Sequence, residues 1–147
     1  SDGTDANWGS APTPDLTSAQ YLGVGTDYSL TNAYAKVDFG TTDIDITLPA
    51  IGTYLLISTL IFTNGATAAD LVYFKFRNTT DAADVAGSEI ILNRGDSENH
   101  TEAVLISILN IANAPKTIEV WGYNAGSANG TVYATLSKSI FIKIAST

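Results

Sequence analysis

The residues best suited to acid–base chemistry are few in this sequence. His100 is the only histidine, so a Ser-His-Asp relay would have to use it, and it stands between Glu98 and Glu102 in an expected loop. No nucleophile-elbow motif is present. A solvated loop histidine is the favoured interpretation, and we expect no catalytic residue and no enzymatic activity.

Carboxylates occur in two groups that could act on a sugar or hold a cation. Asp43 and Asp45 could form the acid pair of a glycoside hydrolase, but they occupy the expected wet face of a strand, where solvated charge is the better interpretation. The second group offers oxygen ligands that Ca²⁺ accepts, yet lacks EF-hand spacing: Asp81, Asp84, Glu89, Asp96, Glu98 and Glu102. We therefore expect no metal ion and no cofactor.

Two further motifs could recognise a partner. Arg94-Gly95-Asp96 has the sequence of an adhesion tripeptide, although an ordinary glycine turn is the favoured interpretation. Tyr73, Trp121 and Tyr123 have outward parity on strands expected to be neighbours, so they could form a platform for sugar rings, or side chains from long loops could cover them. The candidate ligand surface is therefore Tyr73, Trp121, Tyr123 and Arg94, and the expected ligand is a host-surface glycan or a small polar molecule.

Composition narrows the classes of partner. The chain has 147 residues, the size of one domain, and its 45% hydrophobic and 15% charged residues indicate that some apolar surface is buried against another subunit. A net charge of -8 with only seven Lys and Arg argues against nucleic acid as a partner. No stretch approaches the roughly 18 apolar residues that span a bilayer, so no membrane span is expected.

The sequence divides into a lead-in and one domain. Residues 1–20 are rich in Ser, Thr, Asp, Gly, Ala and Pro and are expected to form a linker, whereas residues 21–147 form a single domain of strands separated by turns. The segments 43–48, 71–77 and 116–123 alternate apolar and polar residues, which predicts strands with one face toward water.

Three other strands are apolar on both alternating sets: residues 53–63, 103–111 and 139–144. A parallel sheet buried on both faces would need crossover helices, and no helical periodicity is present. Each sheet of a two-layer sandwich has only one inner face, so a second apolar face needs a cover from outside the sandwich. We expect another copy of the chain to supply it.

The segment Ile51–Phe62 resembles the third core strand of the tumour-necrosis-factor and complement globular-head superfamily. It has a Gly-x-Tyr entry, a small polar residue midway and a closing aromatic, here Gly52, Tyr54, Ser58 and Phe62. The chain end, residues 140–145, is similar to the last strand of that family. The resemblance implies an all-β, two-sheet antiparallel jelly-roll sandwich that assembles as a homotrimer.

The resemblance also implies which residues look toward the trimer axis: Leu55, Ile57, Thr59, Val104, Ile106, Ile140 and Ile142. The lead-in, the acidity and the Thr/Asn/Ala-rich turns resemble bacteriophage versions of the domain. We therefore expect a structural and host-surface-binding knob at the distal tip of a phage tail needle or tail fibre, extracellular on the virion. The alternative is a carbohydrate-binding β-sandwich module of a secreted protein.

Overall fold

The computed structural model describes residues 17–63, 71–93, 100–126 and 130–146, and strands make up nearly all of their regular secondary structure. They form two six-stranded sheets and a two-stranded ribbon. The elements are β1 (Ser18–Leu22), β2 (Val24–Gly25), β3 (Tyr28–Ser29), β4 (Ala35–Lys36), β5 (Gly40–Thr42), β6 (Ile46–Leu48), β7 (Gly52–Thr63), β8 (Leu71–Asn78), β9 (Ala83–Asp84), β10 (Ile90–Asn93), β11 (Thr101–Ile111), β12 (Lys116–Asn124), β13 (Thr131–Val132), the 3₁₀ helix η1 (Ala134–Leu136) and β14 (Lys138–Ala145).

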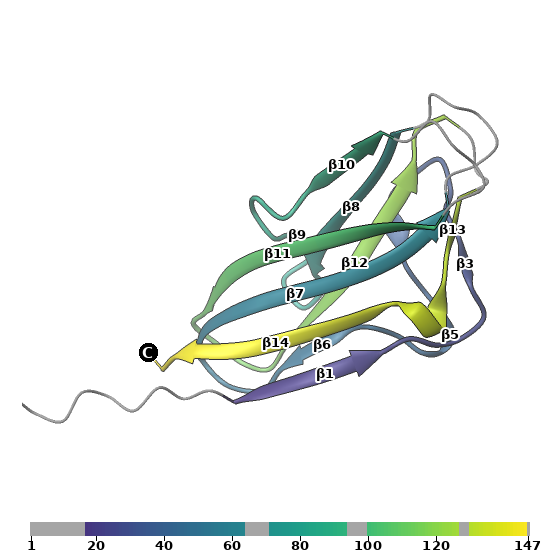
Figure 1. The fold of residues 1–147 in the computed structure, drawn as a ribbon. Coiled ribbons are helices and arrows are strands. Elements are labelled where there is room, and N and C mark those ends of the chain that lie inside the picture. The colour runs from purple at the N-terminus through teal and green to yellow at the C-terminus, as the bar shows by residue number, and fades with distance from the viewer. Residues whose placement is uncertain (1–16, 64–70, 94–99, 127–129, 147) are drawn as a thin grey trace, which may run out of the picture.

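The first layer, here called the β7 sheet, is built on the 12-residue strand β7. β11 pairs antiparallel along one edge of β7, while β14 and β13 share its other edge, and β1 and β3 pair outside them. Four long strands therefore run side by side in the order β11, β7, β14, β1 (Figure 1). β7 begins at Gly52, where a side chain is excluded because φ is +146° and a Cβ would lie only 2.6 Å from the Ala145 carbonyl oxygen.

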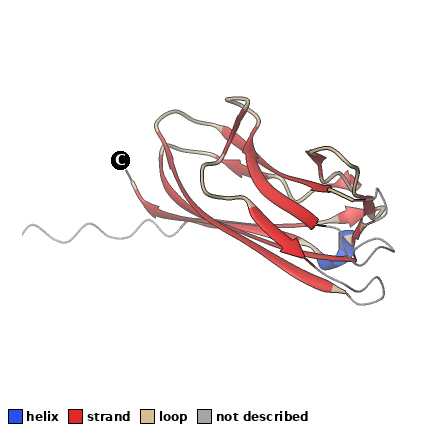
Figure 2. Ribbon diagram, turned by 90° about the horizontal axis from the view of Figure 1, so that it is seen from above, coloured by secondary structure: helices blue, strands red, loops and turns tan. Residues whose placement is uncertain are grey.

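The second layer, the β12 sheet, has the order β10, β8, β12, β4, with β6 also pairing β12 and β9 pairing β8. Seen from above, the two layers run along one long axis (Figure 2). Strict alternation explains the layering, because β8 and β12 each bury every second residue. All pairings between the described strands are antiparallel, and most of them join strands that are not consecutive in the sequence.

The core lies between the two sheets and consists of their inward side chains. Phe62 of β7 and Phe74 of β8 join the layers edge to face, with ring centroids 5.3 Å apart, and neither is exposed to solvent. Tyr54 packs in the same way on Phe141, at 5.5 Å. One cluster of buried hydrophobic residues thus joins the described strands of both sheets.

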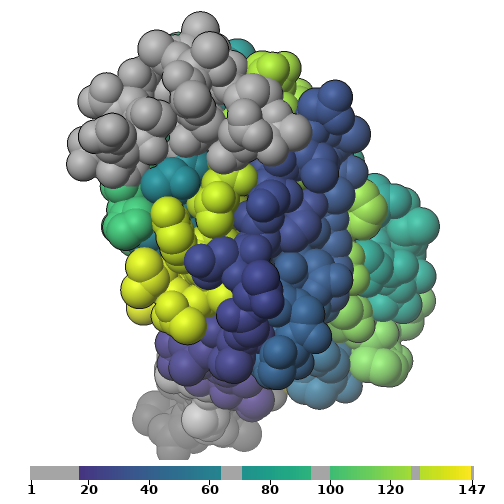
Figure 3. Space-filling view, turned by 90° about the vertical axis from the view of Figure 1, so that its right-hand side faces the viewer, coloured from purple at the N-terminus to yellow at the C-terminus, as the bar shows by residue number. Residues whose placement is uncertain are grey.

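One end of the sandwich is closed by the segment from β2 to β5, which lies beside η1 (Figure 3). Asp27 fixes this contact by accepting a hydrogen bond from the Ala134 amide at 2.9 Å. The start of β1 and the end of β14 lie at the opposite end (Figure 1), in agreement with the pairing of Ser18 with Ile142.

The all-β prediction is confirmed, and the structure adjusts two details. β1 begins at Ser18, so it includes three residues that the sequence analysis placed in the lead-in, and it pairs with β14. The strand expected over residues 43–48 is shorter, because β6 spans only Ile46–Leu48. Among the described residues no helix is long and apolar enough to cross a membrane.

Candidate functional site

The outer face of the β7 sheet carries an uninterrupted group of aliphatic side chains. In one rung across the sheet Ile106 of β11 is opposite Ile57 of β7, which is opposite Ile140 of β14. The next rung places Ile108, Leu55 and Ile142 side by side in the same order. We call this group the apolar stripe and define it as Leu55, Ile57, Val104, Ile106, Ile108, Ile140 and Ile142.

The apolar stripe consists of the outward-facing side chains of β7, β11 and β14, whose inward-facing side chains are already buried in the core. Ala103 and Leu105 of β11 are at most 1% exposed, whereas Val104, Ile106 and Ile108 are 42, 59 and 66% exposed. Leu55, Ile57, Ile140 and Ile142 are half-buried beside them. A contiguous exposed apolar face of this kind is typical of a protein–protein contact surface.

The structure places all seven residues of the predicted trimer interface on this one face. Six of them belong to the apolar stripe, and Thr59 lies beside it, between Val104 and Lys138. Ile108 was missed, although its spacing of two residues from Ile106 would have found it. The alternation of apolar residues within each strand could not show that these three segments form one surface, because that depends on the order of the strands in the sheet.

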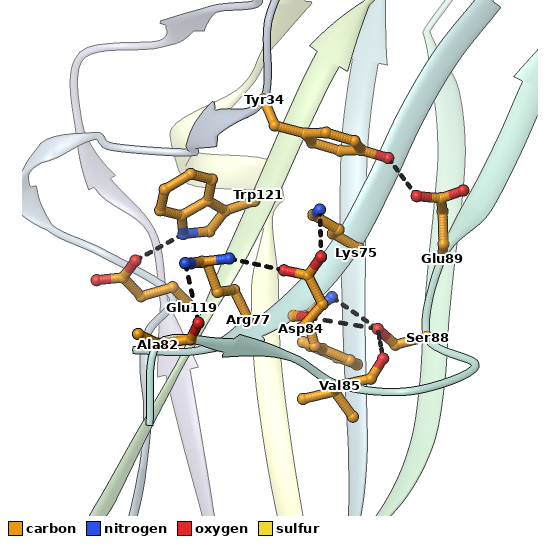
Figure 4. A network of polar contacts seen from close by, with 11 residues as sticks. Tyr34, Lys75, Arg77, Ala82, Asp84, Val85, Ser88, Glu89, Glu119 and Trp121 are labelled. Atoms are coloured by element: carbon orange, nitrogen blue, oxygen red, sulfur yellow. Dashed lines mark hydrogen bonds and ion pairs between the residues drawn. The ribbon is translucent and has the colours of Figure 1, made fainter. Parts of the chain in front are cut away.

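The outer face of the β12 sheet carries a different surface, a network of aromatic and charged side chains (Figure 4). Tyr34 donates a hydrogen bond to Glu89 at 2.7 Å, and the Lys75 ammonium lies 3.8 Å from the centre of the Tyr34 ring. Asp84 accepts hydrogen bonds from Lys75 at 2.7 Å and from Arg77 at 2.9 Å. The network ties the loop before β10 to β8 and to the segment before β4.

Tyr73, Trp121 and Tyr123, the predicted aromatic platform, are half-buried within this network. The rings of Tyr73 and Tyr123 stack on each other at 4.5 Å, and Tyr34 contacts Tyr123 edge-on at 4.4 Å. Arg77 lies 4.9 Å from the Trp121 ring centre. Tyr73 and Tyr123 thus each cover one face of the other ring, and Arg77 lies near the Trp121 ring. A sugar-stacking surface at these rings stays a prediction.

The pKa shifts of Tyr34 and Asp84 indicate that the charges of this network stabilise the fold. Burial raises the pKa of Tyr34, and the hydrogen bond to the carboxylate of Glu89 raises it further. The hydrogen bond from Lys75, together with that from Arg77, lowers the pKa of Asp84. Tyr34 therefore stays neutral and Asp84 stays ionised at neutral pH, which keeps each hydrogen bond in its strongest form.

Asp43 and Asp45, interpreted above as solvated charge, are in fact half-buried around one lysine. The Lys36 ammonium lies 2.6 Å from Asp43 and 2.8 Å from Asp45. Burial raises the pKa of Asp45. The interpretation was wrong because Lys36 is seven residues away in the sequence and reaches the pair only through the fold. The ion pairs hold the two carboxylates in a structural cluster.

Of the remaining candidate residues, the structure describes His100 and part of the acid-rich loop. His100 is exposed, and its ring contacts Tyr133 edge-on at 4.6 Å. Among the acid-rich loop residues, Asp81 forms an ion pair with Lys116 and Asp84 pairs with Lys75 and Arg77. Within the described ranges no group of three or more histidine or carboxylate side chains could hold a metal ion. Arg94, like Asp96 and Glu98, lies outside the described residues.

Comparison with known proteins places the fold. No protein-family model matches the sequence, and no curated protein does. The structure of murine APRIL superposes with a TM-score of 0.60 over 88% of this chain and 99% of that chain, at 12% identity. Eiger TNF from S. frugiperda superposes with a TM-score of 0.54 over 92% of this chain and 96% of that chain, also at 12% identity.

These similarities define the fold of the chain as a TNF-like jelly roll, as the resemblance of the Ile51–Phe62 segment implied. At 12% identity they establish the architecture and leave the activity to be argued from the site. The feature of the site that needs an explanation is the apolar stripe.

Proposed function

We propose that this chain is a non-enzymatic binding knob that assembles as a homotrimer through the apolar stripe. The observation that carries the proposal is the exposure of Val104, Ile106 and Ile108 on the outer face of the sheet, in register with Ile57 and Leu55. Covering these exposed side chains supplies a favourable free energy of about 25 cal/mol per Å² of apolar surface buried.

A second copy of the chain is the partner that this surface favours. The net charge of -8 opposes non-specific association, so a contact between copies must use a surface that carries few charges, and the apolar stripe contains none. The resemblance to the TNF-like family implies three copies around one axis, with each stripe facing that axis.

The arrangement of the strand ends supports an attachment role. The start of β1 and the end of β14 lie together at one end of the sandwich (Figure 1). A shaft joined to this end would present the opposite end, closed by η1 and the β2–β5 segment, to a target. We propose that the knob caps a bacteriophage tail needle or tail fibre and contacts the host surface, where a glycan or a small polar molecule is the expected ligand.

A carbohydrate-binding module of a secreted protein is the alternative from another class, and it predicts a monomer. Multi-angle light scattering of the purified chain at micromolar concentration separates the two proposals. We expect the mass of three chains, and a monomer over the whole concentration range would refute the knob. The parent gene gives a second test, because a long heptad segment before this domain indicates a needle, whereas a hydrolase domain indicates a binding module.

A further inference from the structure

Two oppositely charged residues flank one end of the apolar stripe, the end where β7 finishes at Thr63 and β11 begins at Thr101. Glu102 of β11 has the same outward parity as Val104 and Ile106, and it is opposite Ile61 in the pairing with β7. Lys138 of β14 has the same outward parity as Ile140, and it is opposite Thr59. Both side chains are exposed. The stripe thus has an acidic corner on its β11 flank and a basic corner on its β14 flank.

Neither charge has an ionic partner within the described part of the chain, which distinguishes them from the cations of the other sheet. Lys36, Lys75 and Arg77 each lie within 2.9 Å of a carboxylate, and Lys116 pairs with Asp81. Strand β7 separates Glu102 from Lys138 by two strand spacings, about 10 Å, and by one rung of about 7 Å along the strands. The two corners are too far apart to pair with each other in one chain.

Rotational assembly brings such corners together. In a ring of identical chains the interface is heterologous, so the β11 edge of one copy faces the side of the next copy that β14 and β1 form, where Lys138 is opposite Leu22 of β1. Rotation about an axis along the strands keeps each residue at its height, and the heights of Glu102 and Lys138 differ by only that one rung. Two long side chains can bridge a gap of about 7 Å.

We propose, as an extension that rests on the proposed trimer, that Glu102 of each copy forms an ion pair with Lys138 of the neighbouring copy. Three such pairs then form a ring around the axis, at the end of the apolar stripe where β7 finishes and β11 begins. The stripe supplies the burial, and the ring fixes the register and the direction in which one copy follows the next. The partner is a second copy of this chain because its β14 flank carries the complementary charge at the matching height.

The test is a charge-swap series at low ionic strength, where exposed ion pairs are least screened. Sedimentation velocity over a concentration series measures the assembly constant of the wild-type chain, E102K, K138E and the double variant E102K/K138E. Asn32→Lys, an exposed change between β3 and β4 and outside the apolar stripe, is the control for an added positive charge. Circular dichroism checks that each variant folds.

We expect each single charge reversal to lower the assembly constant at least about tenfold, because it places two like charges side by side at each of the three interfaces. The double variant E102K/K138E should return to within about threefold of the wild-type assembly constant. A double variant no better than the singles, or single variants as strong as Asn32→Lys, overturns the ion pair while leaving the trimer standing. A monomeric wild-type chain overturns the proposed function itself. If either reversal prevents folding, the neutral pair E102Q and K138Q gives the same cycle, and an absence of coupling between them overturns the proposal.

Discussion

Replacing Ile106 with aspartate is expected to abolish assembly and to leave the single chain folded. Ile106 is 59% exposed in one chain, so the substitution removes little of the core. Full burial of an isoleucine contributes about 1.5–3 kcal/mol, so the part still exposed accounts for about 1–2 kcal/mol per subunit in the assembly. An uncompensated carboxylate buried at the interface costs about 3–5 kcal/mol more.

The sum is about 4–7 kcal/mol per subunit, and a trimer contains three such sites. A tenfold change in the assembly constant requires only about 1.4 kcal/mol. The lower estimate for a single site, about 4 kcal/mol, therefore already lowers the assembly constant more than a hundredfold. The intrinsic cost of aspartate in the strand of a single chain is at most about 1 kcal/mol. The two effects are therefore well separated.

The assay is sedimentation velocity at micromolar concentration with far-ultraviolet circular dichroism on the same samples. Ile91→Asp is the matched control, because Ile91 is 56% exposed but lies on β10 in the other sheet. We expect folded monomers of Ile106→Asp and trimers of Ile91→Asp. An Ile106→Asp chain that sediments like wild type would refute the use of this face, and so would dissociation of the folded Ile91→Asp chain.

Ile57→Asp tests the same face at its centre, since Ile57 lies between Ile106 and Ile140. The cost is several kcal/mol per subunit, because the substitution brings unpaired charges near one another on the axis. We expect monomers or a misfolded chain. The opposite parity of β7 is already buried in the core, so a stable trimer of this variant would mean that the trimer does not use the outer face of the β7 sheet.

Three further predictions concern the stability of the single domain, each measured by denaturant unfolding. Gly122→Ala should cost about 1–3 kcal/mol through overpacking, because a Cβ at this position would lie 2.6 Å from the buried Phe74 ring; an unchanged midpoint would mean that the ring can move. Ser58→Ala should cost about 1–3 kcal/mol, because it removes the 2.9 Å hydrogen-bond partner of the buried Ser139 hydroxyl. Ser139→Ala should cost less, because the Ser58 hydroxyl keeps its 3.3 Å hydrogen bond to the Lys138 carbonyl. The double variant should cost less than the sum of the two, and strict additivity would contradict the pairing. Asp84→Asn should cost at most about 1 kcal/mol at pH 7, as its side chain is 47% exposed. Because the folded pKa of Asp84 is lowered, this contribution is present above the ordinary value of 3.8 and is lost as the pH falls through the folded pKa, so a difference between wild type and variant that persists in acid would refute the assignment.

The alternation of residue types determined much of this protein from the sequence alone. A strand has a period of two, so the outward parity of residues 53–63, 103–111 and 139–144 could be assigned without knowing which strands are neighbours. The apolar character of both parities predicted a covered outer face, and the TNF-like fold followed from the Gly52, Tyr54, Ser58 and Phe62 pattern. These are local properties of the chain, and the structure places every predicted interface residue on one face.

Strand order and register were decided only by the tertiary structure, because pairings between distant segments depend on the packing of the whole core. Only the structure sets Ile106 beside Ile57 and Ile140, and only it shows that Lys36 holds Asp43 and Asp45. The aromatic residues give the sharpest contrast. Their outward parity followed from alternation, but the contact of Tyr34 with Tyr123 joins two segments that no local pattern connects.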